Sequence, residues 1–328
     1  MNRQKIVQKK LLDWYQKNKR DFPWRLTTPN PYYVWISEIM LQQTTTTAVV
    51  PYFLRFIEKY PTLESLKKAS LDDVYLLWQG LGYYSRAKNL HKSAQMIDTF
   101  PNNSKELCRL PGIGDYTSKA IAAIAFEEKV LPLDGNIKRV MARFFGLEVE
   151  EAFLNQAILE RITVEDRPGD FCQAVMDLAR KLCLPKNPLC HECPLNHLCS
   201  KKTDLPFKKE KPSKKRYYTQ AFLIKNEQGI FLTKSYTHNK LLKGLWNVPL
   251  AVFSNQPYAK KAQFSQTIKH IFTHIDLRVD IYQMDDFNDV KDMISFENSM
   301  NENGMFVQDI STVALSTLTK KIICKHDL

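Results

Sequence analysis

Four cysteines stand close together in the segment CLPKNPLCHECPLNHLC. They are Cys183, Cys190, Cys193 and Cys199, with the spacing C-x6-C-x2-C-x5-C. Prolines lie between them, which predicts a compact loop rather than a helix. Four thiolates in one loop can hold a zinc ion or an iron–sulfur cluster. The spacing alone leaves both open, because only one short C-x2-C pair of the kind that zinc sites use twice is present.

A second stretch, LCRLPGIGDYTSKAIAAI at residues 107–124, has the pattern of two helices joined by a tight turn. We expect the first helix to end near Leu110. Gly112 and Gly114 allow the positive φ and close backbone approach that such a turn needs. Asp115 is expected to cap the second helix. Exposed amides at the start of a helix can bind a phosphate without reading base sequence, although the same residues could simply connect two helices.

Two carboxylates have unusually apolar neighbours. Glu38 lies in YVWISEIML, and Asp134 follows an apolar run in VLPLDGNIKRV. A carboxyl group in an apolar pocket has a raised pKa and can act as an acid near neutral pH. A solvated or capping role is the alternative for each of them.

The charge of the chain favours a polyanionic partner. Its 328 residues include 47 Lys and Arg against 35 Asp and Glu, a formal net charge of +12. No apolar run approaches the ~20 residues that a membrane span needs, so nucleic acid is the better candidate. The N-terminal segment has no secretory pattern and the cysteines number seven, so we expect a reducing compartment, the bacterial cytoplasm. Cys108, Cys172 and Cys324 have no predicted role.

The elements that must position these groups divide into three regions. Residues 1–200 have helical periodicity, and residues 201–216 form a lysine-rich, polar segment that suits a solvated linker. Strand patterns then dominate residues 217–328. There FSQTIKHIF has a helix-like pattern, residues 275–281 alternate as a strand does, and STVALSTLTKKIIC suits a short helix. We predict an all-α domain, a basic linker and a smaller α+β domain.

Together these motifs resemble the adenine DNA glycosylases of the MutY type, within the helix–hairpin–helix glycosylase superfamily. The resemblance covers nearly the whole chain. The segments that carry it, beside the four cysteines, are FPWR (22–25), SEIMLQQT (37–44), QGLGYYSRAKNLH (79–91), LPGIGDYT (110–117), LDGNIKRVMAR (133–143), GLWNVP (244–249) and FTH (272–274). It implies a structural [4Fe–4S] cluster on the four cysteines that faces DNA.

The resemblance also implies a chemistry, the removal of adenine mispaired with 8-oxoguanine or guanine after the adenine leaves the base stack. Glu38 is then the acid that protonates adenine, and Asp134 is the anion beside the developing sugar cation. Tyr116 and Asn136 support this centre by hydrogen bonds. Arg25 matches a residue of the pocket, with an ion pair at the end of the first helix as its alternative.

Two other functions need different residues. Endonuclease III-type enzymes share the hairpin, the aspartate and the cluster, but cut the strand through a lysine at the position of Tyr116. Lys119 does not occupy that position, so we expect base removal without efficient strand cleavage. A catalytically silent DNA-binding protein would be expected to lack Glu38 or Asp134, and both are present.

Further residues match positions that recognise the lesion. Three of them, Gln43, Thr44 and Tyr83, are expected to enter the duplex. The alternative for Tyr83 is core packing, and the alternative for Gln43 is a hydrogen bond at a helix end. Residues 217–328 resemble a Nudix-type domain without the G-x5-E-x7-R-E-x2-E-E-x-G box, so no nucleotide hydrolysis is expected there. Thr273, where many relatives have serine, and His274 are the expected contacts to 8-oxoguanine. We expect a monomer near the nucleoid that binds mispaired double-stranded DNA, with a replication clamp as a candidate partner.

Overall fold

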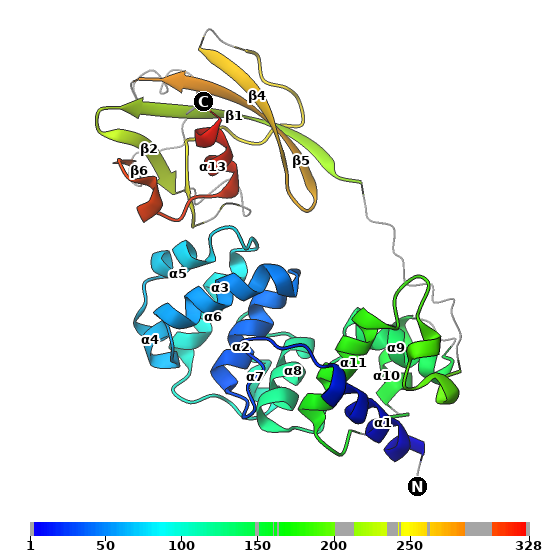
Figure 1. Cartoon of the computed structure of the whole chain (residues 1–328). Coiled ribbons are helices and arrows are strands. Elements are labelled where there is room, and N and C mark those ends of the chain that lie inside the picture. Colours follow the sequence, from blue (N-terminus) through cyan, green and yellow to red (C-terminus); the bar gives the residue numbers. More distant parts are fainter. Residues whose placement is uncertain are drawn as a thin grey trace. The chain divides into compact units, whose positions relative to one another are not determined.

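The computed structural model describes residues 3–147, 151–159, 161–162, 164–200, 213–234, 242, 244–260, 263–285 and 304–325. The chain forms two compact units, Met1–Ala69 with Tyr83–Lys208, and Ser70–Gly82 with Lys209–Leu328 (Figure 1). Most of the predicted linker, residues 201–212, lies outside the described residues. Its last two residues, Lys215 and Arg216, instead begin the first strand of the second unit.

The first unit is helical, as the periodicity of residues 1–200 predicts. Its helices are α1 (Arg3–Asn18), α2 (Pro31–Leu41), α3 (Thr46–Lys59), α4 (Leu63–Lys68), α6 (Ser85–Met96), α7 (Ser104–Leu107), α8 (Asp115–Phe126), α9 (Gly135–Phe145), α10 (Glu151–Leu159) and α11 (Pro168–Lys181). Helix α5 (Leu71–Trp78) falls in the second unit. Two short 3-10 turns, η1 (Cys190–Glu192) and η2 (Asn196–Leu198), lie in the cysteine segment, which is therefore less irregular than predicted.

Helix α2 begins where its sequence provides a strong start signal. The side chain of Asn30 accepts hydrogen bonds from the amides of Tyr32 and Tyr33, at 2.9 and 3.3 Å, and Pro31 occupies the first turn. Proline suits this position because its missing N–H would have no partner there. The helix is apolar on nearly all sides, which is typical of a helix buried within a domain.

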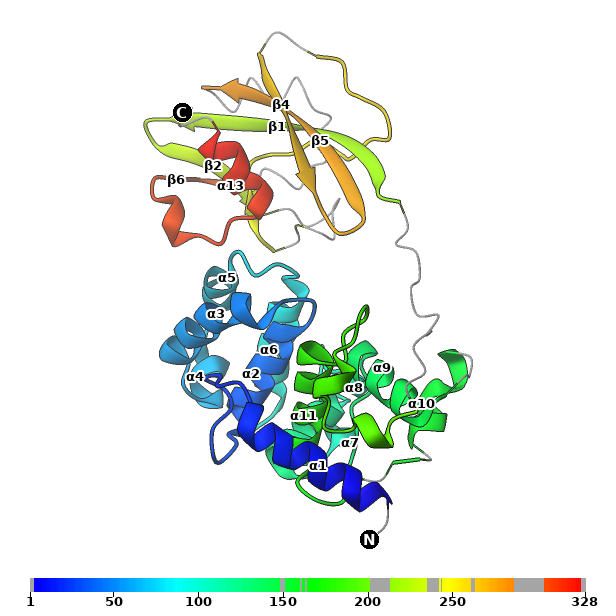
Figure 2. The ribbon, with the colours of Figure 1, turned by 45° about the vertical axis from the view of Figure 1, so that its right-hand side comes forward.

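The long helices pack around one apolar core. Helices α1 and α11 lie side by side in both views, and α11 also packs on α8 and α9 (Figures 1 and 2). Leu11 of α1, Val140 of α9 and Phe171 of α11 are all buried in this core. Three of the four loop cysteines pack against the same core, so the cysteine segment is anchored to α9 and α11.

The predicted helix–hairpin–helix is formed by α7, α8 and the turn between them, with two corrections. Helix α7 ends at Leu107 rather than near Leu110, because the chain turns at once through residues 108–113. Asp115 is the first residue of α8 and not its cap. Gly114 holds the cap position without a side chain, and the Asp115 carboxylate instead pairs with Lys119 Nζ at 2.7 Å.

The second unit contains a mixed six-stranded sheet. Its strands are β1 (Lys215–Asn226), β2 (Gly229–Lys234), β3 (Trp246–Asn247), β4 (Phe264–Ile271), β5 (Ile275–Met284) and β6 (Gly304–Val307). The order is β3-β2-β1-β5-β4, with β6 beside β2, and β1 and β5 run parallel from Lys215–Ile275 to Ile224–Met284. Helix α13 (Thr317–Cys324) packs on this sheet through Leu318 and Ile322, after a 3-10 turn, η3 (Ile310–Thr312).

This unit confirms the predicted mixture of strands and helix but corrects one element. The helix-like segment FSQTIKHIF forms strand β4, because it pairs antiparallel with β5 from Phe264–Tyr282 to Ile271–Asp276. Pairing along the whole strand outweighs a short local pattern. The C-terminal helix is present but shorter than the predicted segment. Within the described residues, no helix combines the length and apolar character that crossing a membrane would require.

The hairpin turn yields a stability prediction. Gly112 has φ +79°, and a Cβ there would lie 2.8 Å from the Cβ of Asn89, whereas a Cβ at Gly114 would meet no atom within 4 Å. We expect Gly112→Ala to lower the free energy of unfolding by about 1–3 kcal/mol, because the left-handed backbone and the clash both oppose it. Gly114→Ala is the matched control and should cost at most about 1 kcal/mol. Equal decreases in melting temperature for the two variants would contradict this interpretation of the turn.

Candidate functional site

A single large pocket in the first unit collects most of the predicted site residues. It has a volume of about 820 Å³, within the usual range of ligand sites. The predicted residues that line it are Arg25, Glu38, Gln43, Tyr116, Asp134 and Asn136. They come from α2 and the turn after it, α8, the start of α9 and the loop after α1. The pocket thus unites residues as far apart in sequence as Arg25 and Asn136.

Glu38 is the one acidic residue of α2, which has no basic residue, and it lines this pocket. Burial raises the pKa of its carboxyl group to about 7, Arg25 acts in the opposite direction, and Asp134 raises it further. Among the described residues, none donates a hydrogen bond to this carboxyl group. Glu38 is therefore a group that can carry a proton at neutral pH and pass it to a molecule in the pocket.

Asp134 is fixed by the helix that follows it. Its Oδ1 accepts hydrogen bonds from the amides of Asn136 and Ile137, at 2.9 and 2.7 Å, so it is the N-cap of α9. The Asn136 side chain donates to the other oxygen at 3.1 Å. Three donors and the positive end of a helix favour a negative charge at this position. The capping role and a role in the pocket are compatible here.

Tyr116 lies in the first turn of α8 and lines the pocket. It is half-buried, its hydroxyl donates to the Met176 sulfur at 3.7 Å, and burial raises its pKa well above the usual value for tyrosine. Lys119 does not line the pocket, and its ammonium group is held by Asp115. The pocket therefore has the phenol of Tyr116 together with the two carboxylates, and the Lys119 amine lies outside it.

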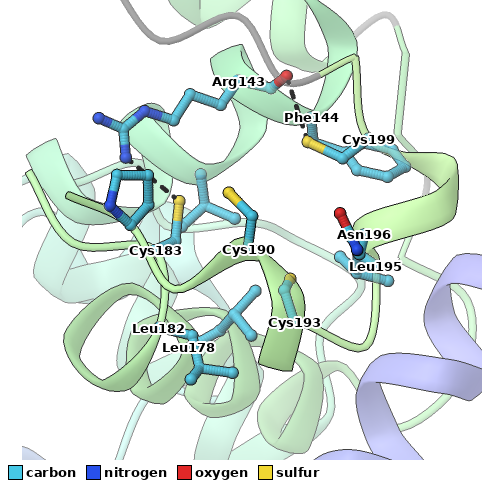
Figure 3. A pocket seen from close by; sticks show the side chains of 12 residues that line it. Arg143, Phe144, Leu178, Leu182, Cys183, Cys190, Cys193, Leu195, Asn196 and Cys199 are labelled. Atoms are coloured by element: carbon cyan, nitrogen blue, oxygen red, sulfur yellow. Dashed lines mark hydrogen bonds between the residues drawn. The ribbon is translucent and has the colours of Figure 1, made fainter.

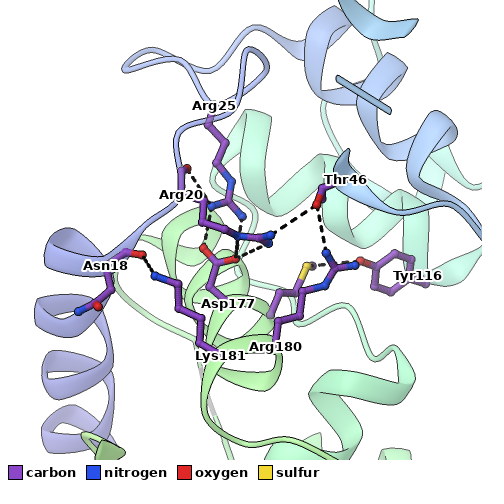
Figure 4. A network of polar contacts seen from close by, with 9 residues as sticks. Asn18, Arg20, Arg25, Thr46, Tyr116, Asp177, Arg180 and Lys181 are labelled. Atoms are coloured by element: carbon purple, nitrogen blue, oxygen red, sulfur yellow. Dashed lines mark hydrogen bonds and ion pairs between the residues drawn. The ribbon is translucent and has the colours of Figure 1, made fainter. Parts of the chain in front are cut away.

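Arg25 forms the predicted ion pair and also lines the pocket. Its guanidinium contacts Asp177 Oδ2 at 2.7 Å, and Arg20 contacts Oδ1 of the same carboxylate at 2.9 Å (Figure 4). The Asp177 side chain is fully buried on α11, and the two arginines lower its pKa against the opposing effect of burial. The sequence did not single out Arg20 or Asp177. An Asp among apolar residues in FCQAVMDLAR was the one available signal.

The two turns that carry Gln43 and Tyr83 share an unusual backbone. Both residues have left-handed φ values, 59° and 50°, and Tyr83 is 45% exposed. Thr44 is half-buried, and its hydroxyl donates to the Gln42 carbonyl at 3.3 Å. Tyr83 and Thr44 do not line the pocket, so the structure separates them from the carboxylates. A left-handed, exposed side chain is costly for folding alone, which fits a residue kept for contact with a ligand.

Gly112 and Gly114 are exposed on the hairpin, where the first amides of α8 lie. Gln42, which the sequence analysis did not assign, reaches this hairpin. Its Nε2 donates to the Gly112 carbonyl and to the Thr117 hydroxyl, both at 3.2 Å. Within the turn, the Ile113 amide donates to the Leu110 carbonyl at 3.1 Å, whereas the amides of Gly112 and Gly114 have no such partner among the described residues.

The four loop cysteines line one small cavity together with apolar residues of α9 and α11 (Figure 3). Arg143 donates to the Cys183 sulfur at 3.5 Å, and the Cys199 thiol lies 3.6 Å from the Arg143 carbonyl. Among the described residues, no three metal-binding side chains converge as closely as one ion requires. A cluster with four irons needs no such convergence, because each thiolate binds a different iron. The Nε2 atom of His191, a residue between two of the cysteines, lies 3.2 Å from Oε1 of Glu192.

A second arginine connects the cysteine loop to the pocket. The Arg139 guanidinium donates to the carbonyls of Cys183 and Ala179 and to the Asn136 side chain, all at 3.0–3.1 Å. Asn136 in turn holds Asp134. The loop and the pocket therefore share one rigid element, the first two turns of α9.

Thr273 and His274 lie in the second unit, where they form the exposed turn between β4 and β5. The turn is closed by a hydrogen bond from the Phe272 amide to the Ile275 carbonyl at 2.9 Å. Both side chains are accessible to a ligand of this unit.

Two family models match the chain. Residues 36–161 match a model described as HhH-GPD superfamily base excision DNA repair protein, and residues 183–199 match the iron–sulfur binding domain of endonuclease III. The second match covers the four cysteines, so this loop holds a [4Fe–4S] cluster.

Similar proteins agree. Adenine DNA glycosylase of Buchnera aphidicola (subspecies Acyrthosiphon pisum, strain APS) is 38% identical over 262 residues, 74% of each chain. The human protein of that name is 40% identical over 207 residues, 58% of this chain and 38% of its own.

Solved structures share the helical fold. A thermostable thymine-DNA glycosylase is 30% identical, with a TM-score of 0.53 over 60% of this chain and 95% of its own. An endonuclease III–DNA complex, 23% identical with a TM-score of 0.51, covers 61% of this chain and 96% of its own, and supports the fold alone. With its pocket of two carboxylates, its hairpin and its cysteine loop, the chain belongs to the adenine DNA glycosylase family of base excision DNA repair enzymes.

Proposed function

We propose that this enzyme removes adenine mispaired with 8-oxoguanine or guanine and leaves the DNA strand intact. One observation supports the chemistry above all. A protonatable carboxyl group, Glu38, and a carboxylate fixed by a helix, Asp134, face the same pocket. Cleavage of a glycosidic bond needs one group that protonates the leaving base and one that stabilises positive charge on the sugar. The environment of Glu38 suits protonation of the base, and the environment of Asp134 suits stabilisation of the sugar cation.

The proposed reaction begins when adenine enters the pocket from the duplex. Glu38 donates its proton to adenine N7, the C1′–N9 bond breaks, and its electrons go to the base. The sugar becomes an oxocarbenium ion, which the Asp134 carboxylate stabilises or captures at C1′. Water then bonds to C1′, the Asp134–C1′ bond breaks where it has formed and returns its electrons to the carboxylate, and the proton of the water goes to the Glu38 carboxylate.

Three neighbours would support these steps. Asn136 keeps Asp134 oriented through the 3.1 Å hydrogen bond, and Tyr116 excludes water as a half-buried wall of the pocket. Arg25 is held in place by Asp177, so its remaining donors can meet the flipped base. Such orientation saves the reacting groups from reorganising during the reaction.

The cysteine loop is proposed to hold its cluster through Cys183, Cys190, Cys193 and Cys199. Arg143 would stabilise the negative charge of this site, since it already donates to the Cys183 sulfur and to the carbonyls of Leu184 and Pro185. When bound, the cluster supplies a structural cross-link, not a reacting group.

Recognition of DNA would use the exposed amides near Gly112 and Gly114 for the phosphate backbone. Gln43, Thr44 and Tyr83 are proposed to contact the opened duplex, with the exposed Tyr83 ring replacing a stacking partner beside 8-oxoguanine. In the second unit, Thr273 and His274 are proposed to contact 8-oxoguanine, in a domain of Nudix-like type. We further propose a monomer that acts at the bacterial nucleoid and can contact a replication clamp.

The decisive experiment separates base removal from strand cleavage. A duplex with one A opposite 8-oxoguanine is treated with excess enzyme, and half of each sample receives alkali. We expect strand breaks only after alkali, because Tyr116 offers no amine and Lys119 is paired with Asp115. Breaks without alkali would indicate a Schiff base and a lyase, and no breaks in either half would leave a DNA-binding role.

Replacing the acid should abolish chemistry but not folding. Glu38→Gln is expected to lower the single-turnover rate by about 10²–10⁴. The wild-type rate should fall as pH rises through about 7, because the protonated form is the active acid. Burial raises the pKa of Glu38 above its unfolded value, so the wild type is destabilised as pH rises towards 7 and the glutamine variant is not. A variant with unchanged rate, or a wild type indifferent to pH from 6 to 8, would contradict the assignment.

The exposed β4–β5 turn should govern lesion preference. Replacing Thr273 and His274 with alanine is expected to slow adenine release opposite 8-oxoguanine by about tenfold or more, and opposite guanine by less than about twofold. Alanine at Glu227 and Gln228, in the exposed β1–β2 turn of the same sheet, is the matched control. An equal loss on both duplexes would argue against a lesion-reading turn.

A further inference from the structure

Arg86, near the start of α6, makes more buried contacts than a packing role requires. It is only 7% exposed. Its Nη1 donates to the carbonyls of Ile39 and Met40, at 3.0 and 2.7 Å, and to that of Gln42 at 2.5 Å. Its Nη2 donates to the Thr44 hydroxyl at 3.3 Å, and its guanidinium lies 5.5 Å from the centre of the Tyr83 ring.

The three carbonyls that accept from Nη1 belong to the end of α2, the helix that carries Glu38. The last carbonyls of an α-helix lack partners within the helix and carry the negative end of its dipole. Arg86 satisfies them and continues into the turn of residues 42–44, which α2 leads into directly. Burial lowers the pKa of Arg86 to about 10, so it remains a cation at neutral pH. One guanidinium thus fixes α2 relative to the residues proposed to enter the duplex, Gln43 and Tyr83.

Gln42 extends the same network to the hairpin. Its carbonyl accepts from Arg86, while its side chain donates to the Gly112 carbonyl and to Thr117. Helix α6 contacts the hairpin too, through Asn89 beneath Gly112 and through the Ser93 hydroxyl, which donates to the Pro111 carbonyl at 2.9 Å. The Gln42 side chain therefore joins the turn 42–44 to the hairpin proposed to bind a phosphate by direct hydrogen bonds. Arg86 joins the same turn to the end of α2.

We propose that Arg86 and Gln42 are positioning residues that couple the binding of the duplex backbone by the hairpin to the extrusion of adenine by the turn 42–44. The inference rests on the proposed function. A hairpin held on a phosphate fixes Gln42, Gln42 and Arg86 fix the turn and the end of α2, and the same helix places Glu38 in the pocket. Neither residue need touch the reacting atoms.

The test separates binding from base release. Arg86→Lys keeps the charge but loses the planar set of donors, and Gln42→Met keeps the length but loses the amide. Each variant and the double variant are assayed in single turnover at saturating enzyme on A opposite 8-oxoguanine. Binding is measured on a duplex whose target adenosine carries a 2′-fluorine, which resists cleavage because it destabilises positive charge at C1′. Arg55→Lys is the matched control, an exposed arginine 4.7 Å from the Tyr52 ring.

We expect each single variant to lose about tenfold or more in rate, while the dissociation constant changes less than about threefold. The double variant should lose clearly less than the product of the two single effects, because both remove one coupling. The pH midpoint near 7 should stay, since Glu38 is untouched.

Independent effects that multiply, or a loss confined to binding, would overturn the proposal. If Arg86→Lys melts far below the wild type, Gln42→Met decides alone, and a rate within about twofold of wild type would overturn it. A wild type that releases no adenine would instead refute the proposed function itself.

Discussion

The burial of one carboxyl group in an apolar helix is the constraint on which the site depends. Glu38 lies on α2 among Trp35, Ile36 and Ile39, which are buried. Raising its pKa from 4.5 to about 7 corresponds to roughly 3 kcal/mol of folding free energy once the group ionises. The helix must therefore be held firmly enough to keep this carboxyl group partly buried. Local opening of the helix would expose the group to water and return its pKa towards the usual value. Asn30 at one end and Arg86 at the other provide that anchoring.

Three arginines of the first unit anchor backbone carbonyls in the same way, two of them buried and Arg139 half-buried. Arg86 binds carbonyls at the end of α2, Arg139 binds carbonyls at the end of α11, and Arg143 binds those that follow Cys183. Each case places a planar cation where several carbonyls lack partners, which lysine could not satisfy equally well. Helix starts supply the complementary groups. Asp134 caps α9 and the hairpin presents the first amides of α8, so the functional groups gather at helix ends.

The sequence predicted the two carboxylates that share the pocket better than it predicted the residues that hold them in place. Glu38 and Asp134 could be found because carboxylates in apolar segments are rare, and the cysteines because their spacing is distinctive. The helical first unit was also predictable from its periodicity. Strand β4 was not, since its pairing with β5 outweighs its local pattern, and Asp115 was misassigned because an ion pair with Lys119 replaces capping. Asp177, Gln42 and Arg86 were missed, because their importance lies in partners distant along the chain or in backbone carbonyls, which no local pattern reveals.

If Glu38 is the acid and residues 42–44 enter the duplex, as proposed, their positions on one helix and directly after it have a mechanical consequence. The turn 42–44 begins where α2 ends, one helical turn beyond Glu38, and helix α2 packs on α8 of the hairpin. A rigid helix transmits displacement without loss over so short a distance, whereas a loop would absorb it. Movement of the turn against the DNA must therefore also move the acid, unless Arg86 and the hairpin hold both. This arrangement would serve the proposed release of adenine only from a mispair, because Glu38 would be correctly placed only when the turn is.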